Sequence, residues 1–203
     1  MTIDVIDLRD FYSQRLGIVA RQLINRGIRA RWPDAKGQRV LGLGYPTPYL
    51  GLFREDSERC LAFMPAAQGV LKWPTARPAL ATLIDEFSMP LPDAAVDRIL
   101  MVHALEMSDD PEGLLREMWR VLKPGGKLIF FELGLSPDPK VQRRQKQLEP
   151  LHHWLFQGLY LTRDIPSLLV EGGFQIEQMQ AGYMAQFPKS SSYCWWGSAI
   201  SQS

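Results

Sequence analysis

Short apolar runs alternate along the chain with segments in which apolar residues recur at helical spacing. Each run is short enough to be a strand buried on both faces, and Gly, Pro and Asp residues separate the runs from the helical segments. The runs predict strands at residues 39–43, 60–64, 81–84, 96–102, 127–132, 174–184 and 191–200. The helical segments predict helices at residues 13–30, from about 47, from 111 to the stop at 124–126, at 141–157 and at 164–171.

Strands that alternate with helices form a mainly parallel sheet with helices on both faces. The last two predicted strands have no helix between them, so they form an antiparallel hairpin at one edge of the sheet. The predicted fold class is therefore α/β, with three layers and a mostly parallel seven-stranded sheet that ends in a C-terminal antiparallel hairpin. A dinucleotide-binding sheet would instead continue with another parallel unit.

The first helical segment is amphipathic and ends at Trp32-Pro33. Its apolar positions lie three or four residues apart, with Arg and Gln between them: Leu16, Val19, Ala20, Leu23, Ile24 and Ile28. Basic residues also outnumber acidic ones across residues 8–40, and a second basic group lies in residues 140–146. Such runs are typical of solvated helix faces. The alternative is a surface that meets an anionic substrate or lipid headgroups, so a peripheral membrane contact stays open.

Composition narrows the classes of function. Of the 203 residues 46% are hydrophobic, which is enough for one well-buried domain, and 23 basic residues nearly balance 22 acidic ones. This balance gives no reason to expect nucleic acid as a partner. Cys60 and Cys194 lack metal-ligand spacing, which predicts a reducing, cytoplasmic location and no metal site. We expect no signal peptide, and no apolar run approaches the ~18 residues that a membrane span needs.

Residues 39–53, RVLGLGYPTPYLGLF, read as a strand that enters a turn and then a helix. Such turns hold nucleotide-like cofactors in α/β proteins, because the helix start offers unpaired N–H groups and small residues let a ligand approach the backbone. Gly42 and Gly44 fit this role. A GxGxxG fingerprint that begins at Gly42 would need glycine where Thr47 stands, so a nicotinamide-dependent oxidoreductase is disfavoured.

Residues 90–128, PLPDAAVDRILMVHALEMSDDPEGLLREMWRVLKPGGKL, resemble the core of a class I S-adenosylmethionine (SAM) dependent methyltransferase. Residues 1 to about 129 are similar to an uncharacterised bacterial group of methyltransferase domains. Two later stretches, FELGLSPDPKVQRRQKQLEPLHHW and LTRDIPSLLVEGGFQIEQMQAGY, look more like bacterial relatives of methyltransferase-like proteins that methylate small thiols. The resemblance implies a Rossmann-like class I methyltransferase fold, SAM as cofactor, S-adenosylhomocysteine as product, and a small-molecule acceptor.

The resemblance also implies a cofactor site, with departures from the family pattern. In the first-strand motif, Gly44 is kept, Gly42 replaces the leading acid, and prolines replace two glycines. Met64 stands where the family has an acid that binds the ribose hydroxyls, at the end of the second strand. The acid that receives the adenine amino group in the family is kept as Asp85. The implied cofactor-binding residues are Gly42, Gly44, Tyr45, Pro46, Thr47, Met64, Asp85, Glu86 and His103.

The missing acid has an energetic consequence. Charge-assisted hydrogen bonds to the ribose hydroxyls are worth roughly 1.5–3 kcal/mol each. We therefore expect weak SAM binding, and we expect that Met64→Asp tightens it.

The candidate catalytic residues are His103 and Tyr12. His103 and Glu106 match the family's fourth-strand end, where the methyl group and its acceptor meet, and His103 would serve a thiol or phenol acceptor as a base. Tyr12 would close over the methionine end of SAM. Each has a structural alternative: His103 lines the pocket, Tyr12 packs on a helix, and Asp85 caps the turn after the third strand. Four further residues lie where the family builds its acceptor pocket, although core packing explains them equally well: His152, His153, Trp154 and Phe156.

We interpret residues 1–203 as a single methyltransferase domain with three parts. Residues 1–38 are an N-terminal helical cap, residues 39–132 a cofactor-binding core, and residues 133–203 the acceptor-side helices and terminal hairpin. One function is methyl transfer to a small lipophilic or thiol acceptor. The alternative is a degenerate methyltransferase fold that acts as a non-catalytic binding or regulatory module, which the two missing ribose-side acids favour.

Overall fold

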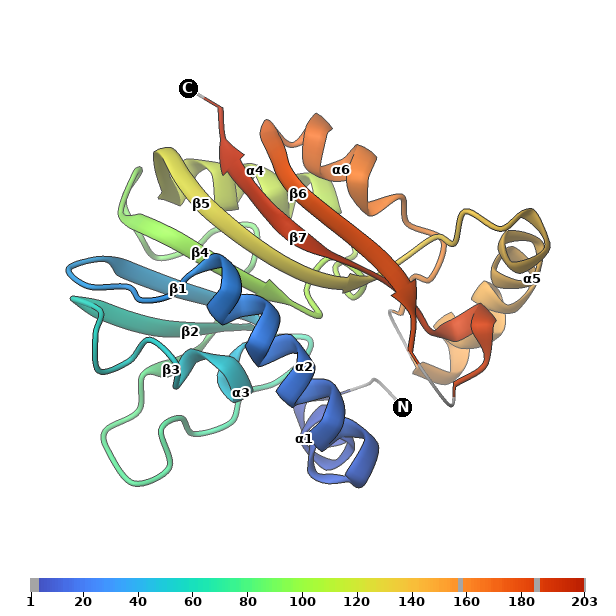
Figure 1. The fold of residues 1–203 in the computed structure, drawn as a ribbon, viewed down its shortest axis with the longest axis horizontal. Helices are drawn as coiled ribbons and strands as arrows, with labels where there is room; N and C mark the ends of the chain where they lie inside the picture. Colours follow the sequence, from blue (N-terminus) through green and yellow to red (C-terminus); the bar gives the residue numbers. More distant parts are fainter. Residues whose placement is uncertain (1–3, 157–158, 185–186, 203) are drawn as a thin grey trace.

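The computed structural model describes residues 4–156, 159–184 and 187–202, except for the side chains of residues 152–156. Its centre is a seven-stranded sheet in the order β3-β2-β1-β4-β5-β7-β6 (Figure 1). Neighbouring strands from β3 to β5 are parallel, whereas β7 runs antiparallel to both β5 and β6. The predicted fold class is confirmed. The strands are β1 (Arg39–Gly44), β2 (Arg59–Pro65), β3 (Ala81–Ile84), β4 (Val96–Val102), β5 (Leu122–Leu133), β6 (Phe174–Tyr183) and β7 (Tyr193–Ser201).

Helices cover both faces of the sheet. They are α1 (Val5–Ser13), α2 (Arg15–Arg31), α3 (Thr47–Leu50), α4 (Pro111–Val121), α5 (Pro139–Phe156) and α6 (Ile165–Glu171). Side chains of α4 and α6 belong to one apolar core, and those of α1, α2 and α3 belong to the core on the opposite face. Successive strand residues alternate between the two cores, with Leu41 and Leu43 in the first and Val40 in the second.

The predicted helix start before α4 is confirmed. Asp110 caps the helix, since its carboxylate accepts the backbone N–H of Gly113 at 2.9 Å, and Pro111 occupies the first helical position. Trp119 lies at the edge of the core that this helix covers. It is 44% exposed, and its indole packs over Gly173 and donates to the carbonyl of Gln202.

The N-terminal region holds two helices where the pattern predicted one. Asp4 begins α1 with a capping box: its carboxylate accepts the N–H groups of Ile6 and Asp7, and the carboxylate of Asp7 accepts the N–H of Asp4. Gln14 is extended and separates α1 from α2. A Cβ at Gly17 would lie 2.1 Å from the carbonyl oxygen of Phe11, so glycine there lets the two helices meet at a sharp bend. The short α1 is what brings Tyr12 to the sheet.

Candidate active site at the carboxyl ends of the strands

The turn after β1 is packed tightly against the end of β4. Gly44 has a φ of 84°, and a Cβ there would lie 2.3 Å from the carbonyl oxygen of Val102. Tyr45 donates its backbone N–H to the same carbonyl at 2.7 Å. At Gly42, a Cβ would meet the ring of Pro46 at 2.5 Å. Both glycines are therefore required by the packing of the chain itself, whatever else they do.

Aromatic rings gather beside this turn. The ring of Tyr45 stacks on that of Tyr12 with centroids 5.6 Å apart, and Tyr49 meets Tyr12 edge to face at 6.0 Å. All three side chains are buried, and Thr47 at the start of α3 is half-buried. The structure thus brings Tyr12 and Tyr45 together, although they come from elements far apart in the sequence.

A chain of short hydrogen bonds crosses the end of β4. The hydroxyl oxygen of Tyr12 lies 2.7 Å from Nε2 of His103, and Nδ1 of His103 lies 2.7 Å from Oε1 of Glu106. The other carboxylate oxygen of Glu106 accepts the backbone N–H of Leu133. His103 has a φ of 54°, a left-handed conformation that is uncommon outside glycine and costs energy. A carboxylate, an imidazole and a hydroxyl in this order form the arrangement by which hydrolases hold a base ready.

Burial and neighbouring charge set the protonation of this chain. Burial raises the pKa of Tyr12 well above its ordinary value, so its phenol stays protonated. Burial alone would lower the pKa of His103, but the charge and hydrogen bond of Glu106 outweigh it, and the pKa is raised. With Glu106 accepting from Nδ1, the Nε2 atom of the neutral ring keeps its lone pair free for an O–H donor.

Glu132 holds the backbone of the loop that carries His103 and Glu106. Its two carboxylate oxygens lie 3.1 Å from the backbone nitrogen of Ala104, and one of them also accepts the N–H of Glu106 at 3.2 Å. Complete burial, and then the charge of Glu106, raise the pKa of Glu132 to about 8. No sequence pattern marks a role for Glu132, because only the fold brings it under the loop that follows β4.

Met64 lies in a closed part of the molecule. Its side chain is 0% exposed and belongs to the apolar core beneath α1, α2 and α3. A carboxylate introduced at this position would therefore be buried among apolar side chains.

Gln68, which the sequence analysis did not single out, joins the end of β2 to that of β4. It is 3% exposed, its side-chain nitrogen donates to the carbonyl of His103 at 3.2 Å, and its Oε1 is buried without a hydrogen-bond partner. No sequence signal marks this residue, since it stands in an irregular loop.

Asp85 and Glu86 follow β3 on the rim. Asp85 is exposed, and its Oδ1 accepts the backbone N–H of Phe87 at 2.9 Å, which is the turn-capping contact of the structural alternative. Glu86 is half-buried and accepts a hydrogen bond from the hydroxyl of Ser108. Burial raises the pKa of Glu86. Among the hydrogen bonds of the described residues, none joins Asp85 or Glu86 to Tyr12 or His103.

Two features bear on whether SAM fits here. The exposed carboxylate of Asp85 suits an amino group, and the unpartnered Oε1 of Gln68 suits a hydroxyl or amino donor. The residues therefore fit SAM on the β2, β3 and β4 side. Helix α1 covers this place, because the backbone N–H of Val5 donates to the carbonyl of Gln68 at 2.8 Å. The predicted acceptor pocket of His152, His153, Trp154 and Phe156 lies outside the side chains described.

The strand order and the single antiparallel strand define the class I methyltransferase fold. A SAM-dependent methyltransferase from Mesorhizobium loti shares it, with a TM-score of 0.60 and 17% identity over 86% of this chain and 96% of that one. The [4+2]-cyclase SpnF shares it as well, with a TM-score of 0.68 and 18% identity over 90% of this chain and 81% of that one. The fold alone therefore does not fix the reaction.

Sequence comparison agrees with the fold. Residues 41–130 match the family model described as a methyltransferase domain. The ubiquinone/menaquinone biosynthesis C-methyltransferase of Shewanella oneidensis is 35% identical over 80 residues, which make up 39% of this chain and 32% of that protein. The match thus spans about a third of the curated relative. Among the residues described, no helix is long and apolar enough to cross a bilayer.

Proposed function

We propose that the protein transfers the methyl group of SAM to a small acceptor with an ionisable O–H or S–H group, and that His103 removes the proton. The observation that carries this proposal is the chain of short hydrogen bonds from Tyr12 through His103 to Glu106, at the end of β4. The methyltransferase-domain match over residues 41–130 supports the cofactor. Lipophilic character and a thiol are both compatible with this acceptor class.

When bound, SAM supplies an electrophilic methyl group on a sulfonium. Displacement at such a centre depends on alignment, which tight packing at the strand ends supports. A thiol or phenol becomes a far better nucleophile once it has lost its proton. Nε2 of His103 accepts that proton, and Glu106 orients the ring and stabilises the imidazolium that forms.

Tyr12 stands in for the acceptor in this closed arrangement. Its hydroxyl oxygen lies where an acceptor oxygen would lie to give its proton to Nε2 of His103, and its raised pKa keeps it a neutral donor. We infer that α1 moves aside when the acceptor binds, and that the acceptor exchanges its hydrogen bond for that of Tyr12. Asp85 and Gln68 would hold the cofactor through its amino and hydroxyl groups.

The test begins with titration calorimetry of SAM and S-adenosylhomocysteine, followed by assays of S-adenosylhomocysteine release with phenol and benzenethiol as probe acceptors. We expect turnover with wild type and a loss of ~10²–10⁴-fold with His103→Asn. Tyr12→Phe is the matched control, since it keeps the stacked ring but frees Nε2, and we expect its kcat to stay within a few-fold of wild type. SAM binding with no turnover on either probe would instead favour the non-catalytic module, which the absence of a carboxylate at Met64 also favours.

A further inference from the structure

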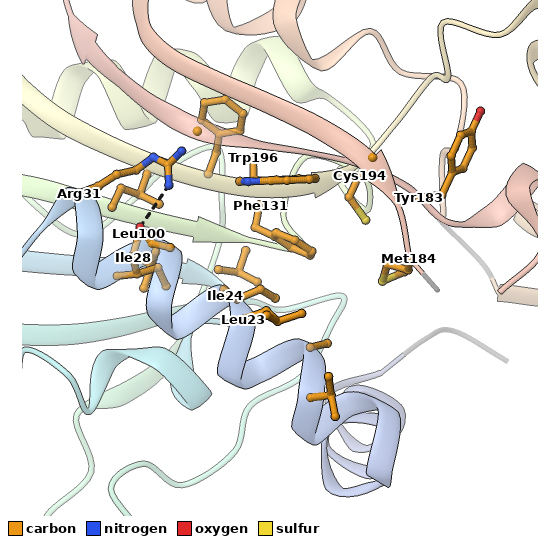
Figure 2. Close-up of a pocket in the computed structure, with 18 of the residues that line it drawn as sticks. Leu23, Ile24, Ile28, Arg31, Leu100, Phe131, Tyr183, Met184, Cys194 and Trp196 are labelled. Carbon is orange, nitrogen blue, oxygen red and sulfur yellow. Dashed lines mark hydrogen bonds between the residues drawn. The ribbon is translucent and has the colours of Figure 1, made fainter. Parts of the chain in front are cut away.

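An apolar groove lies between α2 and the face of β4, β5 and β7 (Figure 2). Leu23 and Ile24 line its helix side, and Phe131 and Trp196 line its sheet side. Its volume is about 470 Å³, which falls within the ~300–1,000 Å³ typical of small-molecule sites. The part of the lining that the structure describes carries one charged side chain, Arg31.

The groove exists because the apolar stripe of α2 is wider than the core that it covers. Ile28 is buried, but Val19 is 53% exposed and Leu23 is 60% exposed. Full burial of such a side chain is favourable. An uncovered apolar surface that is walled on two sides marks a binding site for an apolar group.

Arg31 places a positive charge in the lining of this otherwise apolar groove. Its Nη1 donates to the carbonyl of Gly27 at 3.1 Å, while its Nε is buried without a partner. None of the ion pairs among the described residues includes Arg31. A buried guanidinium nitrogen with no acceptor is costly, and a carboxylate is the group whose two oxygens match the guanidinium fork.

We propose that this groove binds a single-chain lipid carboxylate, with the chain between α2 and the sheet and the carboxylate at Arg31. Figure 2 places Arg31 at one end of the groove, and Tyr183 and Met184 at the other. Between them lies Phe131, whose ring centroid is 5.9 Å from that of His103. The bound chain thus passes beside the candidate active site. This inference goes beyond the proposed function, because nothing in that function assigns the groove or its ligand.

The test is titration calorimetry of the full chain with dodecanoate as the probe, below its micelle concentration and without SAM. We expect saturable binding of one dodecanoate, and affinity that falls about fourfold for each methylene removed in decanoate and octanoate. Arg31→Gln should weaken dodecanoate binding ~10-fold or more while leaving 1-dodecanol binding unchanged, because only the carboxylate uses the charge.

Matched variants on the same helix sharpen the result. Arg26 is exposed and does not line the groove, so Arg26→Gln should bind dodecanoate like wild type. Leu23→Glu changes an exposed side chain inside the groove, so the protein should fold, as judged by circular dichroism, and bind dodecanoate at least ~10-fold more weakly. Equal affinity in wild type and Arg31→Gln, or equal loss in Arg26→Gln, would overturn the proposal.

Two further results would also overturn the proposal, because each assigns the groove to a different occupant. Co-sedimentation with phosphatidylglycerol vesicles, combined with no binding of monomeric dodecanoate, would assign the α2 face to a membrane surface. A dimer in sedimentation velocity that Leu23→Glu dissociates, again without dodecanoate binding, would assign the groove to a second copy of the chain. Because these measurements contain no SAM, the groove proposal and the methyltransferase proposal fail independently.

Discussion

Nε2 of His103 lies 2.7 Å from the hydroxyl oxygen of Tyr12, although 91 positions separate these residues in the chain. The contact joins helix α1 to the end of β4. In the function proposed above, Tyr12 fills the place next to His103 that an acceptor would occupy. Access to the candidate base, His103, therefore depends on the position of α1.

His103→Asn should reduce kcat/KM for a phenol or thiol acceptor by ~10²–10⁴-fold, because the amide cannot take up the proton. Asn is the right replacement, since the position has a φ of 54° and Asn tolerates left-handed backbone better than Ala. The rate is measured as S-adenosylhomocysteine release. SAM affinity by calorimetry should stay within a few-fold. Full activity in this variant would mean that alignment alone drives the transfer.

Glu106→Gln should lower kcat by ~10²-fold or more while leaving SAM affinity nearly unchanged. The Gln oxygen would accept the N–H of Leu133, as a Glu106 oxygen does now, and its NH₂ would then face Nδ1 of His103. This orientation favours the tautomer with the proton on Nε2, which cannot act as a base. The ring ¹⁵N shifts of His103 in the two proteins report the tautomer directly. Unchanged shifts with lost activity would contradict this account.

The mostly parallel sheet, its antiparallel C-terminal hairpin and the start of α4 could be predicted because they depend on local patterns. Buried parallel strands are short apolar runs, and Asp110 before Pro111 is a helix start whatever surrounds it. Helix α1 was missed because its apolar pattern is weak, and what distinguishes it from α2 is an extended Gln14 and a close contact at Gly17.

The candidate site was predictable only in part. The family motif marked His103 and Glu106, and Tyr12 was expected at the methionine end of SAM. The hydrogen bond between Tyr12 and His103 depends on how α1 folds back, which no local pattern predicts. Gln68 could not be found, since its role comes from a loop that meets β4 in space. The exposure of Trp119 was unpredictable too, because it depends on Gly173 from another element.

Asp85→Ala should weaken SAM binding ~10-fold or more if its carboxylate receives an amino group of the cofactor. The variant also removes the cap on the N–H of Phe87, so it needs a matched control. Asp85→Asn keeps an oxygen for that cap and loses the charge. Equal loss of affinity in both variants, with unchanged melting temperatures, would support the cofactor role, whereas a fall in melting temperature for Asp85→Ala alone would support the cap.

Met64→Asp should destabilise the fold by about 2–5 kcal/mol, because it removes a fully buried apolar side chain and buries a carboxylate. The measurement is the free energy of unfolding in urea. Met64→Leu is the control of similar volume and should cost less than ~1.5 kcal/mol. If Met64→Asp were as stable as wild type and bound SAM more tightly, the position would face the ribose after all.

The stability of the protein should fall as the pH rises from about 5 to 8. The folded-state pKa of Glu132 is about 8, above its ordinary value, and the pKa of His103 is also raised. Between each ordinary pKa and its raised value, the folded state holds more protons than the unfolded state, so stability is lost with increasing pH, by up to about 1.4 kcal/mol per pH unit for each proton. Urea unfolding at pH 5, 6.5 and 8 measures the slope. Glu132→Gln should flatten it, since the amide does not titrate, while Glu177→Gln, at an exposed position, should leave it unchanged. A wild-type stability that stays level over this range would mean that Glu132 is ionised in the folded protein, held by the N–H groups of Ala104 and Glu106.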